Sequence, residues 1–247
     1  MANPDNPRLD DAQIVDPRPS GERNVVLSCP EEIAGLKSIK WSTPSPSLMD
    51  QFSHALEDAH DEKPLQRFFE NHPVALLTGL VRPHTAWVIP RPKLPTPNGG
   101  GWVPDFMVCE WSSVGPDWII VELESPTKTP LTKAGGVSYI CNHAAEQINN
   151  YKTFIREHGY YLRANGWPKL HAECRGVIVI GRRSDPNRSK YADKLEAFRR
   201  QRIEVVSYDR LVEDCAFMQK VVSKGNGVDA EYPNTTSLST ISTSGQI

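Results

Sequence analysis

The sequence predicts an α/β fold of the α+β, mixed-sheet kind, in which helices flank one sheet. Five apolar runs of strand length support this class: residues 86–89, 102–109, 117–124, 175–181 and 203–206. Segments whose apolar residues recur every three to four positions alternate with these runs, which is typical of helices packed on a sheet. The predicted order is helix, three strands, long helix, strand, helix, strand and helix.

The predicted helices have identifiable sequence signals. Residues 48–56 and 64–72 read as the first two helices, and Pro64 suits a first helical turn, which needs no N–H donor at that position. Leu65, Phe68 and Phe69 form the apolar stripe of the second helix, and Pro73 starts a short continuation through Leu77. Three more helices are predicted: a long one over 137–157, a basic one over 187–201 and one starting near Tyr208.

Turn residues separate the predicted strands. The prolines at 90 and 92 end the strand at 86–89, because proline cannot donate to a ladder. Residues 112–115, which contain two serines and a glycine, join the next two strands. The apolar run 175–181 is typical of a strand covered on both faces, which places it near the centre of the sheet.

Composition shifts predict one ordered domain with two extensions. Residues 1–47 are expected to be a poorly ordered extension, with a short strand at 24–28 and a linker at 42–47. Residues 48–222 form the predicted domain. The Ser/Thr-rich segment 223–247 has no core-forming pattern and is expected to be a flexible tail.

Composition also excludes several classes of protein. No apolar run approaches the roughly 20 residues that a membrane span requires, and the N-terminus lacks the apolar core of a secretory signal, so a cytoplasmic protein with no membrane partner is expected. The five cysteines lack zinc-type spacing and are interpreted as reduced, packed thiols. No small-molecule cofactor is expected. The net charge of −2 gives no global attraction for nucleic acid, although the basic segment 182–202 is either a phosphate-facing surface or a solvated helix face.

Three carboxylates lie on two of the predicted strands. Glu122 and Glu124 end the run 117–124, and Asp105 lies in the run 102–109. Side chains two residues apart on a strand share one face, with roughly 6.5–7 Å between their Cα atoms. If the two strands are neighbours, the three carboxylates converge at one sheet edge. Such a cluster favours a hard divalent cation.

These segments resemble a known family when taken in order. Val103-Pro104-Asp105, then Glu122-Leu123-Glu124, then Gln147 followed four residues later by Tyr151, are similar to the motifs of the PD-(D/E)xK nuclease superfamily. Its restriction-endonuclease-like core has αβββαβ order, which the predicted elements match. Residues 65–73 and 203–211 resemble more specifically the Shedu antiphage-defence nuclease domain, and this resemblance covers roughly residues 60–215.

The resemblance implies a metal-dependent DNA endonuclease or nickase of bacterial antiphage defence. Asp105, Glu122 and the carbonyl of Leu123 would hold Mg²⁺ or Mn²⁺, and Gln147 and Tyr151 would face that site from the long helix. The alternative for these two residues is a solvent-facing Gln147 and a Tyr151 that fills the core. The expected partner is DNA, and assembly into a homo-oligomer is compatible with the sequence but not established by it.

Glu124 departs from the pattern, because the family usually has lysine at this position. The glutamate either acts on water or a second metal, or a lysine reaches back from the loop at 125–136 (Lys128 or Lys133), or catalysis has been lost. In the last case the domain would be a catalytically silent binder of nucleic acid or of a protein partner. Glu62 is either a support for the metal site or a simple helix-N-terminal acid. His143, four residues before Gln147, either contacts the site or is an exposed helical histidine.

Overall fold

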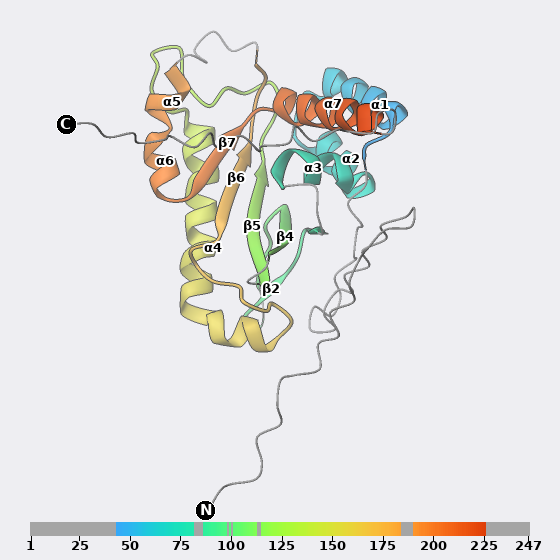
Figure 1. The fold of residues 1–247 in the computed structure, drawn as a ribbon. Helices are drawn as coiled ribbons and strands as arrows, with labels where there is room; N and C mark the ends of the chain where they lie inside the picture. The colour runs from blue at the N-terminus through green and yellow to red at the C-terminus, as the bar shows by residue number, and fades with distance from the viewer. Residues whose placement is uncertain are drawn as a thin grey trace, which may run out of the picture.

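The computed structural model describes residues 43–81, 86–97, 99, 101–112, 115–183 and 190–225. The predicted strand at 24–28, most of the predicted N-terminal extension and nearly all of the predicted tail lie outside these residues. Within them, the element order follows the predicted one, and Figure 1 shows the central sheet with helices on both faces.

The central sheet has five strands and mixed direction. They are β1 (Ala86–Pro90), β4 (Phe106–Ser112), β5 (Gly115–Leu123), β6 (Arg175–Val179) and β7 (Ile203–Val206), in the spatial order β1-β4-β5-β6-β7. The pairs β1–β4 and β4–β5 are antiparallel, whereas β5–β6 and β6–β7 are parallel. The α+β mixed-sheet class predicted from the sequence is therefore confirmed.

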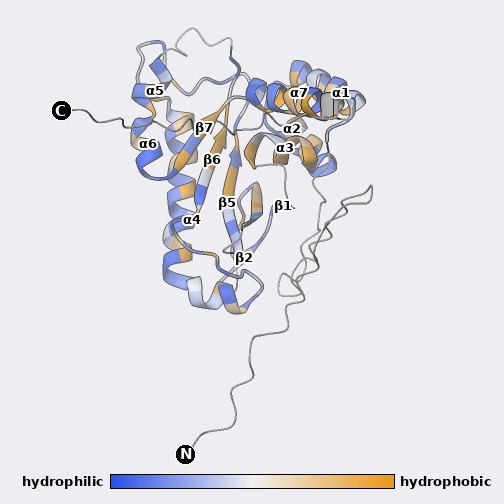
Figure 2. Cartoon of the chain, viewed as in Figure 1, coloured by the Kyte–Doolittle hydropathy of each residue, from blue (hydrophilic) through white to orange (hydrophobic). Residues whose placement is uncertain are grey.

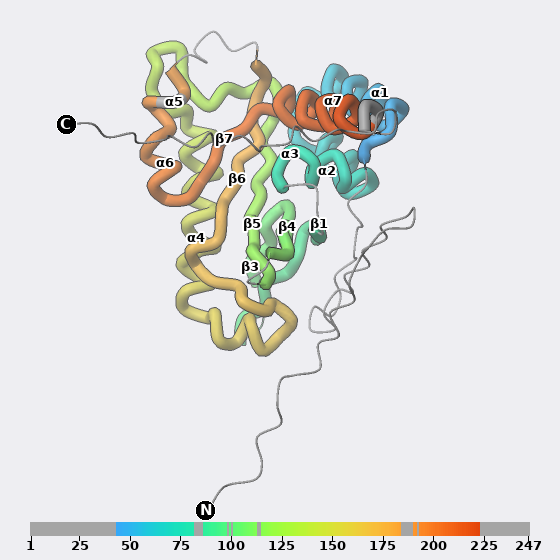
Figure 3. The backbone as a smooth tube through the Cα atoms, viewed as in Figure 1, coloured from blue at the N-terminus to red at the C-terminus, as the bar shows by residue number. Residues whose placement is uncertain are grey.

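Helices cover the two faces of this sheet as two separate groups (Figure 1). One face carries α1 (Pro46–Asp58), α2 (Lys63–Asn71), α3 (Pro73–Leu80) and α7 (Tyr208–Gly225). The other carries the long helix α4 (Tyr139–Ala164) with the short helices α5 (Tyr191–Lys194) and α6 (Glu196–Arg200). Figure 3 traces the path from β5 through α4 to β6, the crossover that a parallel pair of strands requires.

Alternation along β5 divides the core between these two groups of helices. Ile119, Val121 and Leu123 pack with the helices of the α2 face, whereas Trp118 and Ile120 pack against α4. Successive strand side chains point to opposite faces, so a strand covered on both sides is apolar at consecutive positions. Figure 2 shows these apolar strands between helices whose outer faces are hydrophilic. Glu122 interrupts this pattern on the α4 side.

Hydroxyl caps fix the starts of two helices. The Ser45 hydroxyl accepts from the Leu48 N–H at 3.1 Å, and α1 begins at Pro46. The predicted linker at 42–47 is therefore wrong for its last two residues, because capping serine and N-terminal proline start a helix there. The Ser138 hydroxyl accepts from the Cys141 N–H at 3.2 Å and caps α4.

Two predicted elements are divided in the structure. The predicted strand 102–109 breaks, because Pro104 has no N–H to give to a ladder. Its first residue belongs to β3 (Gly101–Trp102), which pairs with β2 (Leu94–Pro95) in a separate two-stranded sheet, and β4 begins at Phe106. The predicted basic helix 187–201 is α5 and α6, which are separated at Leu195, whose side chain turns into the core beside α4.

Two exclusions made from composition can be compared with the described residues. None of their helices combines the length and apolar character needed to cross a bilayer. Cys109, Cys141, Cys174 and Cys215 are all buried in the core, as predicted.

Candidate active-site cleft

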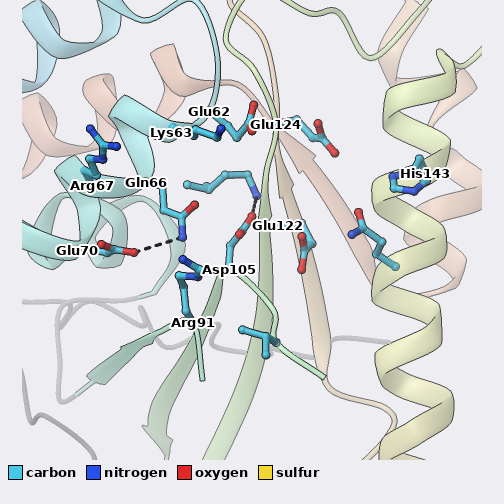
Figure 4. Close-up of a pocket in the computed structure, with 13 residues that line it drawn as sticks. Glu62, Lys63, Gln66, Arg67, Glu70, Arg91, Asp105, Glu122, Glu124 and His143 are labelled. Carbon is cyan, nitrogen blue, oxygen red and sulfur yellow. Dashed lines mark hydrogen bonds between the residues drawn. The ribbon is translucent and has the colours of Figure 1, made fainter. Parts of the chain in front are cut away.

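A cleft of about 620 Å³ opens between α2 and α4, over the ends of β4 and β5 (Figure 4). The strands contribute Asp105, Glu122, Leu123 and Glu124 to its lining, and α4 contributes His143 and Gln147. The opposite wall is one polar face of α2 together with Arg91, which follows β1. The cleft thus joins acidic side chains at the sheet to a facing wall that carries three cations, Lys63, Arg67 and Arg91, beside the acids Glu62 and Glu70.

Asp105 is held by backbone groups on both sides. Its Oδ2 accepts from the Leu123 N–H at 2.9 Å, and its own carbonyl accepts from the Arg91 N–H at 2.8 Å. Burial raises the pKa of Asp105, and the Glu62 carboxylate adds to that rise, whereas the Leu123 N–H and the Arg91 charge oppose it. Asp105 lies just before β4, which begins at Phe106. Its side chain is therefore held against the end of β5 by the bond from the Leu123 N–H.

Glu122 is a buried acid with an unsatisfied oxygen. Its side chain is 6% exposed, and Oε1 has no hydrogen-bond partner among the described residues. Burial, followed by the nearby Asp105 charge, raises the pKa of Glu122 to about 8, and a hydrogen bond from Tyr151 opposes the rise. Buried charges in proteins are normally paired or coordinate a metal, so this carboxylate needs either a proton or a cation.

Glu124 lies further out on the same face of the strand and is only half-buried. Its N–H donates to the Val179 carbonyl at 2.8 Å, and its carbonyl accepts from the Tyr208 hydroxyl at 2.7 Å. Burial, with the Glu62 and Asp105 charges, raises the pKa of Glu124 to about 7. The backbone is thus fixed on two sides while the carboxylate remains accessible in the cleft (Figure 4).

The three acids share the cleft, but they do not form a compact set of ligands. No group of three or more His, Cys, Asp or Glu side chains within the described residues is arranged to hold a metal ion. The expected convergence of three carboxylates on one ion is therefore not reproduced. What remains is the pair Asp105 and Glu122 with the Leu123 carbonyl. Because the Glu124 N–H points to β6 and the Leu123 N–H to Asp105, the Leu123 carbonyl also points to the Asp105 side.

The two predicted α4 residues lie at different depths. Gln147 is half-buried and lines the cleft. Tyr151, one turn further, is 4% exposed and stands behind Glu122, where its hydroxyl donates to the Val103 carbonyl at 3.4 Å and interacts with the Glu122 carboxylate. Tyr151 is therefore a core residue in contact with an acid of the site, and it does not line the cleft.

Four residues whose roles the sequence left open differ in whether they line the cleft. Glu62 lines the cleft at the start of α2, and exposed His143 lines it from α4, where its ring lies 6.0 Å from that of Tyr139. Lys128 and Lys133 are exposed loop residues that do not line the cleft. Neither loop lysine therefore takes the place that Glu124 occupies.

The wall that carries Lys63, Arg67 and Arg91, here called the cationic wall, was not predicted from the sequence. α2 presents Lys63, Gln66, Arg67 and Glu70 to the cleft, opposite its buried Leu65 and Phe69. Their spacing of three and four residues was a readable signal of one helix face. Arg91 carried no such signal, because it lies between two prolines in a connection whose direction only the folded chain defines.

A profile of the family described as Shedu protein SduA, C-terminal, matches residues 59–212. The match extends from the residues before α2 to the first turn of α7, so it includes every residue that lines the cleft. It covers more than half of the chain. No curated protein matches the sequence.

Proposed function

The chain belongs to the family of Shedu SduA C-terminal domains, and on this premise we propose that it is a metal-dependent DNA endonuclease or nickase of antiphage defence. The proposal adds to family membership a specific site, formed by Asp105, Glu122 and the neighbouring groups of the cleft. DNA is the expected substrate because its phosphates complement the cationic wall.

The observation that carries the proposal is the unpartnered, buried Oε1 of Glu122 beside Asp105. Two carboxylates and a carbonyl are oxygen ligands, which hard cations such as Mg²⁺ and Mn²⁺ prefer. Asp105, Glu122 and the Leu123 carbonyl would hold such an ion. When bound, it would polarise the phosphate and lower the pKa of its water.

The surrounding side chains have complementary roles in this proposal. Glu124, with a pKa near 7 and an accessible carboxylate, is suited to take a proton from water at neutral pH. The Gln147 amide offers a donor and an acceptor that can orient a water molecule from the α4 wall. Tyr151 holds Glu122 from behind, which fixes the carboxylate without entering the cleft.

A second candidate function is a nuclease-like domain without catalysis that binds nucleic acid or a protein partner. One observation favours it: Glu124 adds negative charge where a phosphate must approach, and neither Lys128 nor Lys133 lines the cleft to offset it. In this alternative the cationic wall would retain DNA, and no bond would be cleaved.

A plasmid assay separates the two functions. Supercoiled DNA is incubated with Mg²⁺, with Mn²⁺ or with EDTA, using the wild type, Glu122→Gln and the matched control Glu146→Gln on the exposed side of α4. The proposal predicts metal-dependent conversion by the wild type and the control, and none by Glu122→Gln. Retention of DNA without conversion supports a silent domain that binds nucleic acid. The absence of both retention and conversion contradicts the nuclease and that nucleic-acid-binding domain, and it leaves a silent domain that binds a protein partner.

A further inference from the structure

Arg91 differs from the other cations of the cleft. Lys63 and Arg67 belong to the exposed face of α2, and within the described residues neither they nor Arg91 form an ion pair with an acid. Glu70, their acidic neighbour, accepts instead from the Gln66 amide at 3.2 Å. Arg91 is the cation whose charge acts on Asp105, the acid that is bonded to the end of β5.

The backbone holds Arg91 beside Asp105. Its N–H donates to the Asp105 carbonyl at 2.8 Å, so the two residues keep a fixed separation. Its φ of 44° lies in the left-handed region, which an L side chain rarely adopts. The flanking Pro90 and Pro92 restrict the chain further. Strain of this kind persists where surrounding structure holds it, and it is frequent at ligand-binding sites.

The side chain is available to a ligand. Arg91 is exposed, it lines the cleft, and Figure 4 shows its guanidinium directed into the space between Asp105 and Gln66. A guanidinium presents a planar set of donors that matches two oxygens of one phosphate. The cleft contains the acids Glu62, Asp105, Glu122 and Glu124, which repel a polyanion such as DNA. A cation close to these acids is needed to offset that repulsion.

We propose that Arg91 binds the phosphate to be cleaved, at the position next to Asp105, and supplies the positive charge that Glu124 cannot. This inference rests on the proposed nuclease function. In this proposal, Arg91 in the connection after β1 contacts the substrate where the bond is cleaved. Lys63 and Arg67 on α2 contact the flanking phosphates.

The test compares Arg91→Ala and Arg91→Lys with Lys93→Ala, an exposed cation two residues away that does not line the cleft. Binding of a labelled DNA duplex is measured in EDTA, where metal-dependent cleavage is absent, across a range of salt concentrations. Plasmid cleavage is measured separately with Mg²⁺ and with Mn²⁺. Thermal unfolding of each full-length variant confirms that it is folded.

Arg91→Ala is expected to weaken binding about tenfold and to reduce the salt slope of log affinity by about one. Its cleavage rate is expected to fall about 100-fold. Arg91→Lys should recover most of the salt slope but only part of the rate, and Lys93→Ala should leave both unchanged. Arg91→Gly relieves the backbone strain, so it should raise the thermal midpoint by about 2 °C and still lose the rate.

An unchanged salt slope in folded Arg91→Ala overturns the inference, as does a slope that falls equally in Lys93→Ala. If the wild type binds DNA but cleaves none with either metal, the nuclease function fails while the binding arm still decides the phosphate contact. If all variants bind and cleave like the wild type, the phosphate contact fails and the nuclease function stands.

Discussion

At the scale of single residues, Glu122 links stability to pH. In the metal-free protein its pKa of about 8, against an ordinary 4.5, means that the folded state holds the proton more tightly than the unfolded chain. The stabilisation is fully present below about pH 4.5 and is lost as the pH rises to 8. We expect the free energy of unfolding to fall by roughly 2–4 kcal/mol over this window.

Thermal unfolding in EDTA from pH 5 to pH 9 measures this dependence. Glu122→Gln removes this titration and leaves that of Glu124, whose pKa is raised to about 7. The midpoint of the variant should therefore change less, and at pH 8.5 it should exceed that of the wild type. Glu146→Gln, on an exposed position of α4, should follow the wild type. A wild-type midpoint that is flat or rises over this range would show that Glu122 is not a buried acid of the folded state.

The proposed metal ligand Asp105 allows a second prediction at the same scale. A ligand that binds only the folded state stabilises it by about 2.7 kcal/mol at a hundredfold excess over Kd, which is roughly 5–10 °C for a domain of this size. Mg²⁺ or Mn²⁺ should therefore raise the wild-type midpoint. Asp105→Asn keeps an acceptor for the Leu123 N–H but loses the charge, so most of the increase should disappear. Equal increases in both proteins would contradict a metal site at Asp105.

At the scale of elements, the start of α7 fixes the end of β5. Tyr208 is fully buried, stacks on Phe69 of α2 at 6.4 Å, and donates its hydroxyl to the Glu124 carbonyl. The Tyr208 N–H also donates to the Gly181 carbonyl after β6, at 3.1 Å. One residue therefore joins α2, α7 and the strand ends that carry the acids, so the site depends on packing between elements.

Tyr208→Phe tests that link because it keeps the ring and removes one hydroxyl. The Glu124 carbonyl loses a buried donor, which should cost about 1–3 kcal/mol, or roughly 2–10 °C in the thermal midpoint. The proposed cleavage rate should also fall, because Glu124 loses part of its support. The same change at Tyr160, which is 85% exposed, should alter neither quantity. A stable Tyr208→Phe would mean that this bond does not hold the strand end.

At the scale of the whole molecule, attraction for DNA must be local, because the net charge is −2. Four cations of the basic segment have acidic neighbours: Arg182 pairs with Asp209, Arg183 with Glu213, and both Arg199 and Arg200 lie near Glu196. We therefore expect these four cations to contribute little to DNA binding. The three cations of the cleft should then give a salt slope of log affinity of about −3. Replacing Arg199 and Arg200 together by alanine should leave this slope unchanged, and a shallower slope in that variant would identify the basic segment as a DNA contact.

Local signals in the sequence were enough to predict the order of the elements and to find most of the candidate residues that line the cleft. Periodicity and turn residues are local signals, so the strand that carries Glu122 and ends just before Glu124, and the helix that carries Gln147, were predictable. The division of residues 102–109 between β3 and β4 also has a local cause, Pro104. It was not predicted, because the residues around Pro104 read as one continuous apolar strand.

The tertiary structure alone decided what surrounds these acids. The contact of Arg91 with Asp105, the unpartnered oxygen of Glu122 and the bond from Tyr208 to Glu124 each join residues far apart in the chain or depend on burial. Such contacts follow from sheet register and helix packing, which bring together segments with no local relation in sequence. That is why the carboxylates could be found by their spacing, whereas the cation facing them could not.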